Sequence, residues 1–399
     1  MMNSGRQTLQ KHDISGKRLF DLLFIISLLC FVLLWIFDPS GLQQEVFFRR
    51  GQDLLADFLN SVRHVAGNQP YIDGHIQPPL GFLLLVPFRY FADFTCKLEE
   101  LWKTPMAIFA AVLFVVMSEI WLFFMLKKFL KKVSGFPVLL WLLFSGVNLF
   151  SMERGTVVIL SAGCIAGFLA WYDSDIKKER IFACFLLAAA FALKIYPALF
   201  GLLLLKRRDY KGIGYSLLFG LLLTFPLFCF FNGGFGNIPY LLDNLQRYRG
   251  DYFFTVWNLR VIHIFTPGGI EAADKEVFLI IRRCIDVIAI GSTAVSFFSR
   301  RDERLMFSVA SMLILCPVGA AYYTMLYLAV PFIAAYQNDK CSNFITLCWV
   351  LLLTPLRFAL DFNDFLFPLL LCAMLIYNLC RQIKNKDFMF NRKGKSDVF

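Results

Sequence analysis

The sequence predicts an all-α polytopic membrane protein that forms a single integral domain over residues 1–399. Hydrophobic residues make up 58% of the chain and include 46 Phe, which is more apolar surface than one soluble core requires. They occur in long runs that are separated by short clusters of Lys and Arg. Such runs are typical of transmembrane helices, and such clusters are typical of cytoplasmic loops. The net charge of +11 is therefore attributed to topology, and no nucleic-acid partner is expected.

The basic clusters determine the predicted topology, because each is expected to lie in the cytoplasm. An even number of crossings must then separate neighbouring clusters. Both termini become cytoplasmic, as residues 1–18 and the basic tail 381–399. With helices long enough to cross a bilayer, this arrangement gives about twelve transmembrane helices. The clusters lie at residues 6–18, 127–132, 177–180, 206–211, 300–304 and 381–395.

The first outer loop is predicted at residues 38–104, between single spans at 19–37 and 105–126. Its apolar segment 79–92 is too short to cross the bilayer and opens with two prolines, Pro78 and Pro79. We therefore expect an interfacial helix that lies against the membrane.

Three further regions are predicted to form helical hairpins. They cover residues 136–172, 181–205 and 305–336, with turns at 153–155, 194–197 and 316–319. The middle hairpin is too short for two full crossings, so its turn is expected inside the protein, below the outer surface. Single spans at 213–231, 284–299, 343–358 and 365–380, and a second outer loop at 232–280, complete the prediction.

Asp57 in the first outer loop is the candidate general base. Asp53 and Asp57 are one helical turn apart and can project from one face, while Leu54, Leu55 and Phe58 are expected to bind the membrane surface. A carboxylate held beside the bilayer can accept a proton from an incoming hydroxyl group. The alternative is a solvated acid on an amphipathic helix.

Lys194 is the candidate phosphate ligand. It follows an apolar helical run, and Pro197 ends that helix, so an ammonium group is expected at a helix break within the apolar layer. A charged group at this depth is costly and indicates a functional site. For a cation such as this ammonium, phosphate is the natural counter-ion. The alternative is a lysine that extends to the outer interface. Arg154 and Arg260 are further candidates, although Arg154 could instead pair with Glu153 or another acid.

Other polar residues suggest weaker roles. Tyr322 and Tyr323 can hydrogen-bond a phosphate or a sugar, or else anchor the chain at the interface. Glu119 lies within a span and is expected to pair with a neighbouring helix. No metal or other cofactor is expected. An alternative divalent-cation site, which no ligand spacing supports, would use His64, His75, His263, Asp57 and Asp73.

Three motifs occur in a fixed order along residues 19 to 340. The first joins Asp57-Phe58 to the stretches 67–71 and 77–87, the second covers 192–197, and the third covers 317–323. Together they resemble glycosyltransferase family 87. These proteins are polytopic GT-C glycosyltransferases, which include polyprenyl-phosphate-mannose-dependent mannosyltransferases. The sequence departs from the family pattern at Gln77, where Tyr is more usual, and at Tyr322, where His is frequent.

The resemblance implies roles for individual residues. Asp57 would deprotonate the acceptor hydroxyl as its oxygen attacks the anomeric carbon, and polyprenyl phosphate would leave with inversion. Lys194, assisted by Arg154 or Arg260, would stabilise the charge on that phosphate. Asp53, Tyr322 and Tyr323 would complete the substrate site.

The function implied is transfer of a single sugar, a mannose-like hexose, from a polyprenyl-phosphate donor to a lipid-linked or glycan acceptor. The reaction would take place on the outer face of a bacterial inner membrane. Two alternatives stay open: a transporter or flippase of lipid-linked sugars, and a polysaccharide polymerase. A transporter is expected to show paired half-repeats, which the sequence does not display.

Overall fold

The computed structural model describes ten segments, and their regular secondary structure is helical apart from one isolated bridge between Ser299 and Phe388. The described residues are 4–37, 54–72, 74–129, 141–251, 275–316, 322–328, 331–332, 343–356, 360–385 and 387–388.

The elements are α-helices and short 3-10 helices, labelled η. In chain order they are α1 (Ser4–Phe37), α2 (Ala56–Ala66), α3 (Pro79–Leu83), η2 (Val86–Tyr90), α4 (Leu98–Leu101), α5 (Pro105–Phe129), α7 (Gly146–Arg154), α8 (Val158–Trp171), α9 (Lys177–Leu193), η4 (Tyr196–Gly201), α10 (Leu202–Lys206), α11 (Tyr210–Leu222), η5 (Pro226–Phe230), η6 (Gly234–Gly236), α12 (Asn237–Asp251), α14 (Lys275–Phe297), α15 (Asp302–Leu315), η8 (Tyr322–Leu328), α17 (Asn343–Leu353) and α18 (Leu360–Lys384).

Several helices are long and apolar enough to cross a membrane, and the protein is an all-α membrane protein. They confirm helices at four of the predicted single spans, and the total of twelve crossings stays a prediction. In the described residues these spans are Leu19–Phe37, Pro105–Phe129, Tyr210–Phe230 and Leu366–Lys384.

Other helix boundaries differ from the prediction. Helix α14 begins at Lys275, inside the segment expected to form the second outer loop. Helix α17 ends at Leu353, shorter than expected, and Pro355 follows, whose ring cannot continue a helix.

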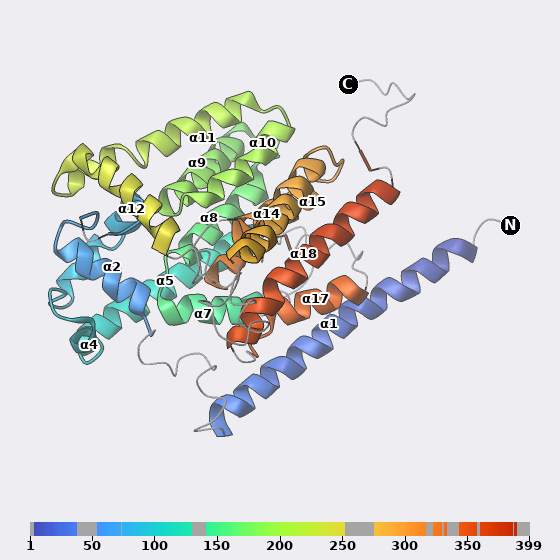
Figure 1. The fold of residues 1–399 in the computed structure, drawn as a ribbon, viewed down its shortest axis with the longest axis horizontal. Helices are drawn as coiled ribbons and strands as arrows, with labels where there is room; N and C mark the ends of the chain where they lie inside the picture. The colour runs from blue at the N-terminus through green and yellow to red at the C-terminus, as the bar shows by residue number, and fades with distance from the viewer. Residues whose placement is uncertain are drawn as a thin grey trace.

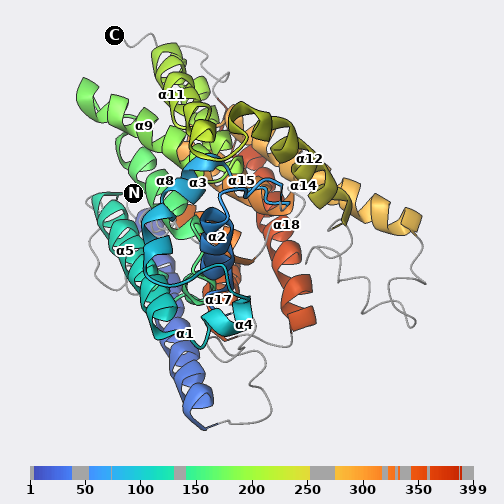
Figure 2. The same ribbon diagram turned by 90° about the vertical axis from the view of Figure 1, so that its left-hand side faces the viewer.

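Two helix groups form the body of the protein. Helices α5, α8, α9 and α11 pack side by side in that order, while α14, α15 and α18 pack together, with α17 between α18 and α1. The 3-10 helix η8 contacts α7, α8 and α15, and thereby links the two groups. The start of α1 and the end of α18 lie at one end of the molecule, and α2, α4 and α12 lie at the other (Figure 1). Viewed from that second end, α2, α3 and α4 lie across the helix bundle (Figure 2).

Breaks between helices are confirmed at the predicted turns 153–155 and 194–197. Gly155 has a left-handed backbone, with φ 65°, and ends α7 before α8 begins. Lys194 has an extended backbone and ends α9, and the chain returns as η4 and α10. In the third hairpin α15 ends at Leu315, while residues 317–319 of its predicted turn lie outside the described residues.

The short apolar segment of the first loop forms α3 and η2, and neither is long enough to cross a membrane. Our expectation that Leu55 and Phe58 bind the membrane surface was wrong. Both are buried within the protein, and the Phe58 ring lies 5.4 Å from the Phe88 ring and 5.2 Å from the Phe114 ring, between centroids. An amphipathic helix must bury its apolar face, and here α5 and η2 supply the partner surface.

At the end of the protein opposite α2, polar and charged residues join the ends of α8 and α10 to the start of α15. The Lys206 ammonium lies 2.8 Å from Asp302 Oδ1, while Arg207 Nη2 and Tyr172 Oη donate to Asp302 Oδ2 at 2.8 and 2.7 Å. Burial acts to raise the pKa of Asp302, but these hydrogen bonds outweigh it and hold the pKa below its usual range. The cluster brings two of the predicted cytoplasmic clusters, 206–211 and 300–304, to one end of the protein.

Candidate active site

Asp57 and Arg154 form an ion pair between the first loop and the first hairpin. Arg154 Nε and Nη2 both donate to the same oxygen, Asp57 Oδ1, at 3.0 and 2.7 Å. Within the described part of the chain, Oδ2 of Asp57 accepts no hydrogen bond. The side chains are 26% and 24% exposed respectively, so the pair faces open space. One oxygen is therefore held in place while the other is available to a ligand.

The fold fixes this pair from both sides. Asp57 lies in the first turn of α2, where the helix dipole favours a negative charge. The Trp102 indole donates to the Leu54 carbonyl at 2.7 Å, and the Leu55 amide donates to the Glu153 carbonyl, beside Arg154. Leu55 itself has a left-handed backbone, with φ 56°, a conformation that costs energy in a non-glycine residue. The start of α2 is thus held directly against the end of α7.

Gly155 permits this close approach. A Cβ atom at this position would lie 2.9 Å from the Phe58 Cβ atom, nearer than side-chain atoms can pack. Its left-handed backbone also ends α7 directly after Arg154. Glycine therefore serves both the turn and the contact between α7 and α2.

Lys194 adds a second cation to the site. It is partly buried at the break between α9 and η4, and its ammonium interacts electrostatically with Asp57. Among the described residues, its side chain forms no hydrogen bond and no ion pair within 4 Å. A cation that acts on the carboxylate without direct contact is available to an anionic ligand.

The other predicted site residues are described only in part. Tyr322 and Tyr323 begin η8, which packs against α7, and their side chains lie outside the described residues. Asp53 and Arg260 also lie outside them. Farther along η8, Tyr327 Oη donates to Ser161 Oγ at 2.8 Å, so η8 is fixed to α8.

The segments predicted to form the two outer loops are joined by asparagines that the sequence analysis did not select. Asn68 Nδ2 donates to Asn232 Oδ1 at 3.1 Å. The backbone amide of Asn232 donates to the backbone carbonyl of Asn68, also at 3.1 Å. Asn244 Nδ2 donates to the carbonyls of Tyr71 and His75, at 2.7 and 3.1 Å. Isolated asparagines in loops carry no sequence signal of pairing across 160 residues or more.

Glu119 pairs with a neighbouring helix, as predicted. Asn148 Nδ2 donates to Glu119 Oε2 at 3.0 Å and thereby ties α7 to α5. Since Arg154 is the last residue of α7, this hydrogen bond also helps to fix the position of Arg154.

The alternative cation site receives little support from the described residues. The His64 and His75 rings are in contact, with centroids 3.8 Å apart, but no group of three or more His, Cys, Asp or Glu side chains gathers there or elsewhere in the described chain. Asp73 and His263 lie outside the described residues.

The fold and site define a helical membrane protein in which a carboxylate and a guanidinium form an ion pair, and an ammonium group at a helix break interacts electrostatically with that carboxylate. The family model of glycosyltransferase family 87 matches residues 76–317, more than half of the sequence, so the chain belongs to this family and is a glycosyltransferase. Arg154, Lys194 and Arg260 lie within the matched segment, and Asp57 precedes it. No curated protein matches the sequence.

We predict that Gly155→Ala destabilises the protein by about 2 kcal/mol, because alanine is strained in the left-handed region and its methyl group would collide with Phe58. Thermal unfolding in detergent measures the change. Gly214→Ala is the matched control, since nothing lies within 4 Å of a Cβ atom at that helical position. Equal loss of stability in the two variants would refute the packing role of Gly155.

Proposed function

We propose that this glycosyltransferase moves a single sugar, a mannose-like hexose, from a polyprenyl-phosphate donor to a lipid-linked or glycan acceptor. The reaction takes place on the extracytoplasmic face of a bacterial inner membrane. The observation that carries the proposal is the ion pair of Asp57 with Arg154, together with the electrostatic interaction between Lys194 and Asp57. An acid, which can take a proton, and two cations, which can bind a phosphate, are the groups that such a transfer requires.

Asp57 is the general base in this mechanism. Arg154 holds Oδ1, which leaves Oδ2 to accept the proton of the acceptor hydroxyl. As the proton moves, the hydroxyl oxygen forms a bond to the anomeric carbon from the side opposite the phosphate. The bond between that carbon and the phosphate oxygen breaks, and its electron pair leaves with polyprenyl phosphate. A single displacement of this kind inverts the anomeric configuration.

Lys194 stabilises the leaving group. Negative charge accumulates on the phosphate as the glycosidic bond breaks, and a preorganised ammonium in a poorly solvated position lowers the energy of that state. Phosphate is already a tolerable leaving group, so orientation and base catalysis suffice without a covalent sugar–enzyme intermediate. This assignment requires no metal ion.

We predict that Asp57→Asn lowers the rate of sugar transfer from a polyprenyl-phosphate hexose by about a thousandfold, since an amide cannot accept the proton. The assay uses purified protein in lipid vesicles and follows radiolabelled sugar into the acceptor. Asp243→Asn is the control, because Asp243 is a half-exposed acid whose ion pair within the described residues is with Arg247 of its own helix. Turnover like that of the parent protein in Asp57→Asn, with folded protein in the membrane, would exclude Asp57 as the base.

We expect Lys194→Ala to weaken donor binding about tenfold or more while changing acceptor binding little, because a charged hydrogen bond to the phosphate is lost. Titration with a polyprenyl monophosphate measures the donor side, and KM for the acceptor measures the other. Lys178→Ala serves as control, since this exposed lysine lies at the far end of the same helix. Unchanged affinity for the lipid phosphate would contradict the role of Lys194.

A further inference from the structure

Glu119 is an acid in the middle of a helix that is long and apolar enough to cross a membrane. It lies about 21 Å from the start of α5 and about 15 Å from its end, at the rise of a helix. Its neighbours Val116 and Ile120 are exposed, and lipid surrounds them when the helix spans the membrane. The Glu119 side chain is partly buried, and its Oε1 atom is buried. The carboxyl group therefore lies far from both aqueous phases.

No cation is paired with Glu119 in the part of the chain that the structure describes. The lysines of its own helix, at 127–128, lie two turns farther along. Helix α8 packs along α5, and the Cys164 thiol is its one titratable group. A carboxylate without a partner in apolar surroundings is costly, so such a group remains protonated instead.

The charged residues of the other two helices beside α5 are already committed or distant. In α7 they are Glu153 and Arg154, at the end of the helix that holds Asp57. Helix α2 meets α5 at Phe114, more than one turn before Glu119, and its charged residues are Asp57, Arg63 and His64. These helices thus leave the charge of an ionised Glu119 uncompensated.

The buried amide of Asn148 uses both of its hydrogen atoms. Nδ2 donates to Glu119 Oε2 at 3.0 Å and to the Leu143 carbonyl at 3.2 Å, and the Met152 sulfur, a weak acceptor, lies 3.8 Å away. Because a carbonyl can only accept, Leu143 also determines which end of the amide is the nitrogen. Two buried acceptors, Glu119 Oε1 and Asn148 Oδ1, then lack a donor among the described residues. They belong to two groups that one hydrogen bond already joins.

We propose that Glu119 is a neutral carboxylic acid, whose Oε1–H group donates to Asn148 Oδ1 while Oε2 accepts from Nδ2. An acid and an amide that exchange two hydrogen bonds in this way form a planar pair. The terminal torsions of carboxyl and amide groups are soft, so a small rotation aligns the second bond. One proton thus gives a partner to both of the unpaired atoms, as buried polar groups require.

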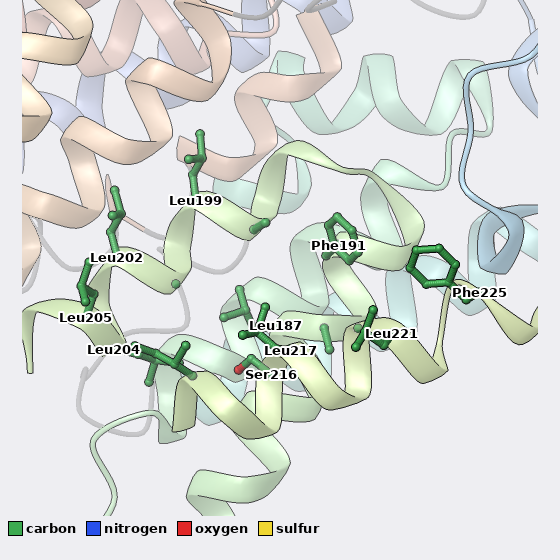
Figure 3. Close-up of a pocket in the computed structure, with 15 residues that line it drawn as sticks. Leu187, Phe191, Leu199, Leu202, Leu204, Leu205, Ser216, Leu217, Leu221 and Phe225 are labelled. Atoms are coloured by element: carbon green, nitrogen blue, oxygen red, sulfur yellow. The ribbon is translucent and has the colours of Figure 1, made fainter. Parts of the chain in front are cut away.

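A cavity elsewhere in the bundle does not reach this pair. It lies between α9, η4, α10 and α11, has a volume of about 480 Å³, and has Ser216 as the one polar side chain of its wall (Figure 3). None of its lining residues belongs to α5 or α7. This cavity therefore brings no water to Glu119 that would stabilise the ionised form.

The pair positions Arg154. The Ser145 hydroxyl accepts from the Asn148 backbone amide at the start of α7, and Arg154 ends that helix about 9 Å farther on. Fixing Asn148 against α5 thus helps to fix the guanidinium that holds Asp57. A second carboxylate would attract this guanidinium through the poorly solvated interior, whereas a neutral Glu119 leaves it to Asp57. Glu119 is therefore a positioning residue, and this role rests on the proposed function.

Infrared difference spectroscopy tests the protonation state without sugar transfer. Parent and variant proteins in lipid vesicles are compared at neutral pH in H2O and in D2O. We expect the carbonyl band of a protonated carboxylic acid, with its deuterium shift, to be lost in Glu119→Gln. The band should remain in Glu99→Gln, which changes an exposed acid of α4. Loss of a carboxylate band in Glu119→Gln, with the acid band unchanged, would overturn the proposal.

The positioning role is tested by two substitutions of Glu119 in the transfer assay with a polyprenyl-phosphate hexose. Glu119→Gln can donate and accept at the same places, so its kcat should stay within about twofold of the parent value. Glu119→Leu is similar in size but leaves the Asn148 amide without this partner, so kcat should fall about tenfold. An equal loss in both variants, or no loss in Glu119→Leu, would overturn the positioning role.

The two experiments separate this inference from the proposed function. Absence of sugar transfer in the parent protein, together with loss of the acid band in Glu119→Gln, would refute the proposed function and leave the neutral acid intact. Transfer in the parent protein with an ionised Glu119 would have the opposite meaning.

Discussion

The ion pair between Asp57 and Arg154 is the interaction on which the active site depends. It joins the start of α2 to the end of α7 and fixes one carboxylate oxygen, while the other stays available for the proposed proton transfer. Charges that are partly removed from water are stable only with good geometry, and two donors on one oxygen provide it. The strained backbone of Leu55 and the glycine at position 155 serve this one contact.

The membrane supplies the second constraint. The sequence predicts that Lys194 lies at a helix break inside the apolar layer, where a charge is costly unless an anion compensates it, and Asp57 acts on Lys194 electrostatically. A lipid-linked phosphate matches this arrangement, because its charged group binds the cation while its chain stays in apolar surroundings.

Features that depend on local chemistry could be predicted from the sequence. Long apolar runs determine where helices lie, and Gly155 and Pro197 mark the ends of α7 and α9, because each residue restricts or frees the backbone at one position. The cost of a charge inside a bilayer indicated Lys194, whereas the predicted topology and the family resemblance indicated Asp57, and Arg154 was a further candidate phosphate ligand. The structure pairs Asp57 with Arg154, and Lys194 interacts electrostatically with Asp57.

Features that depend on contacts between distant segments could not be predicted. The sequence left the acid partner of Arg154 open, because pairing across 97 residues requires the folded chain. Hydrophobic periodicity indicated that Leu55 and Phe58 are covered, but it cannot distinguish a membrane surface from the rings of Phe88 and Phe114. The asparagines that join the outer loops gave no signal for the same reason.

The stereochemistry of the product tests the central claim most directly. Purified protein would be supplied with a polyprenyl-phosphate hexose of known anomeric configuration, and NMR of the product would give the configuration of the new bond. A single displacement assisted by Asp57 predicts the opposite configuration to that of the donor. Retention would require a different mechanism and would contradict the role of Asp57 as a general base.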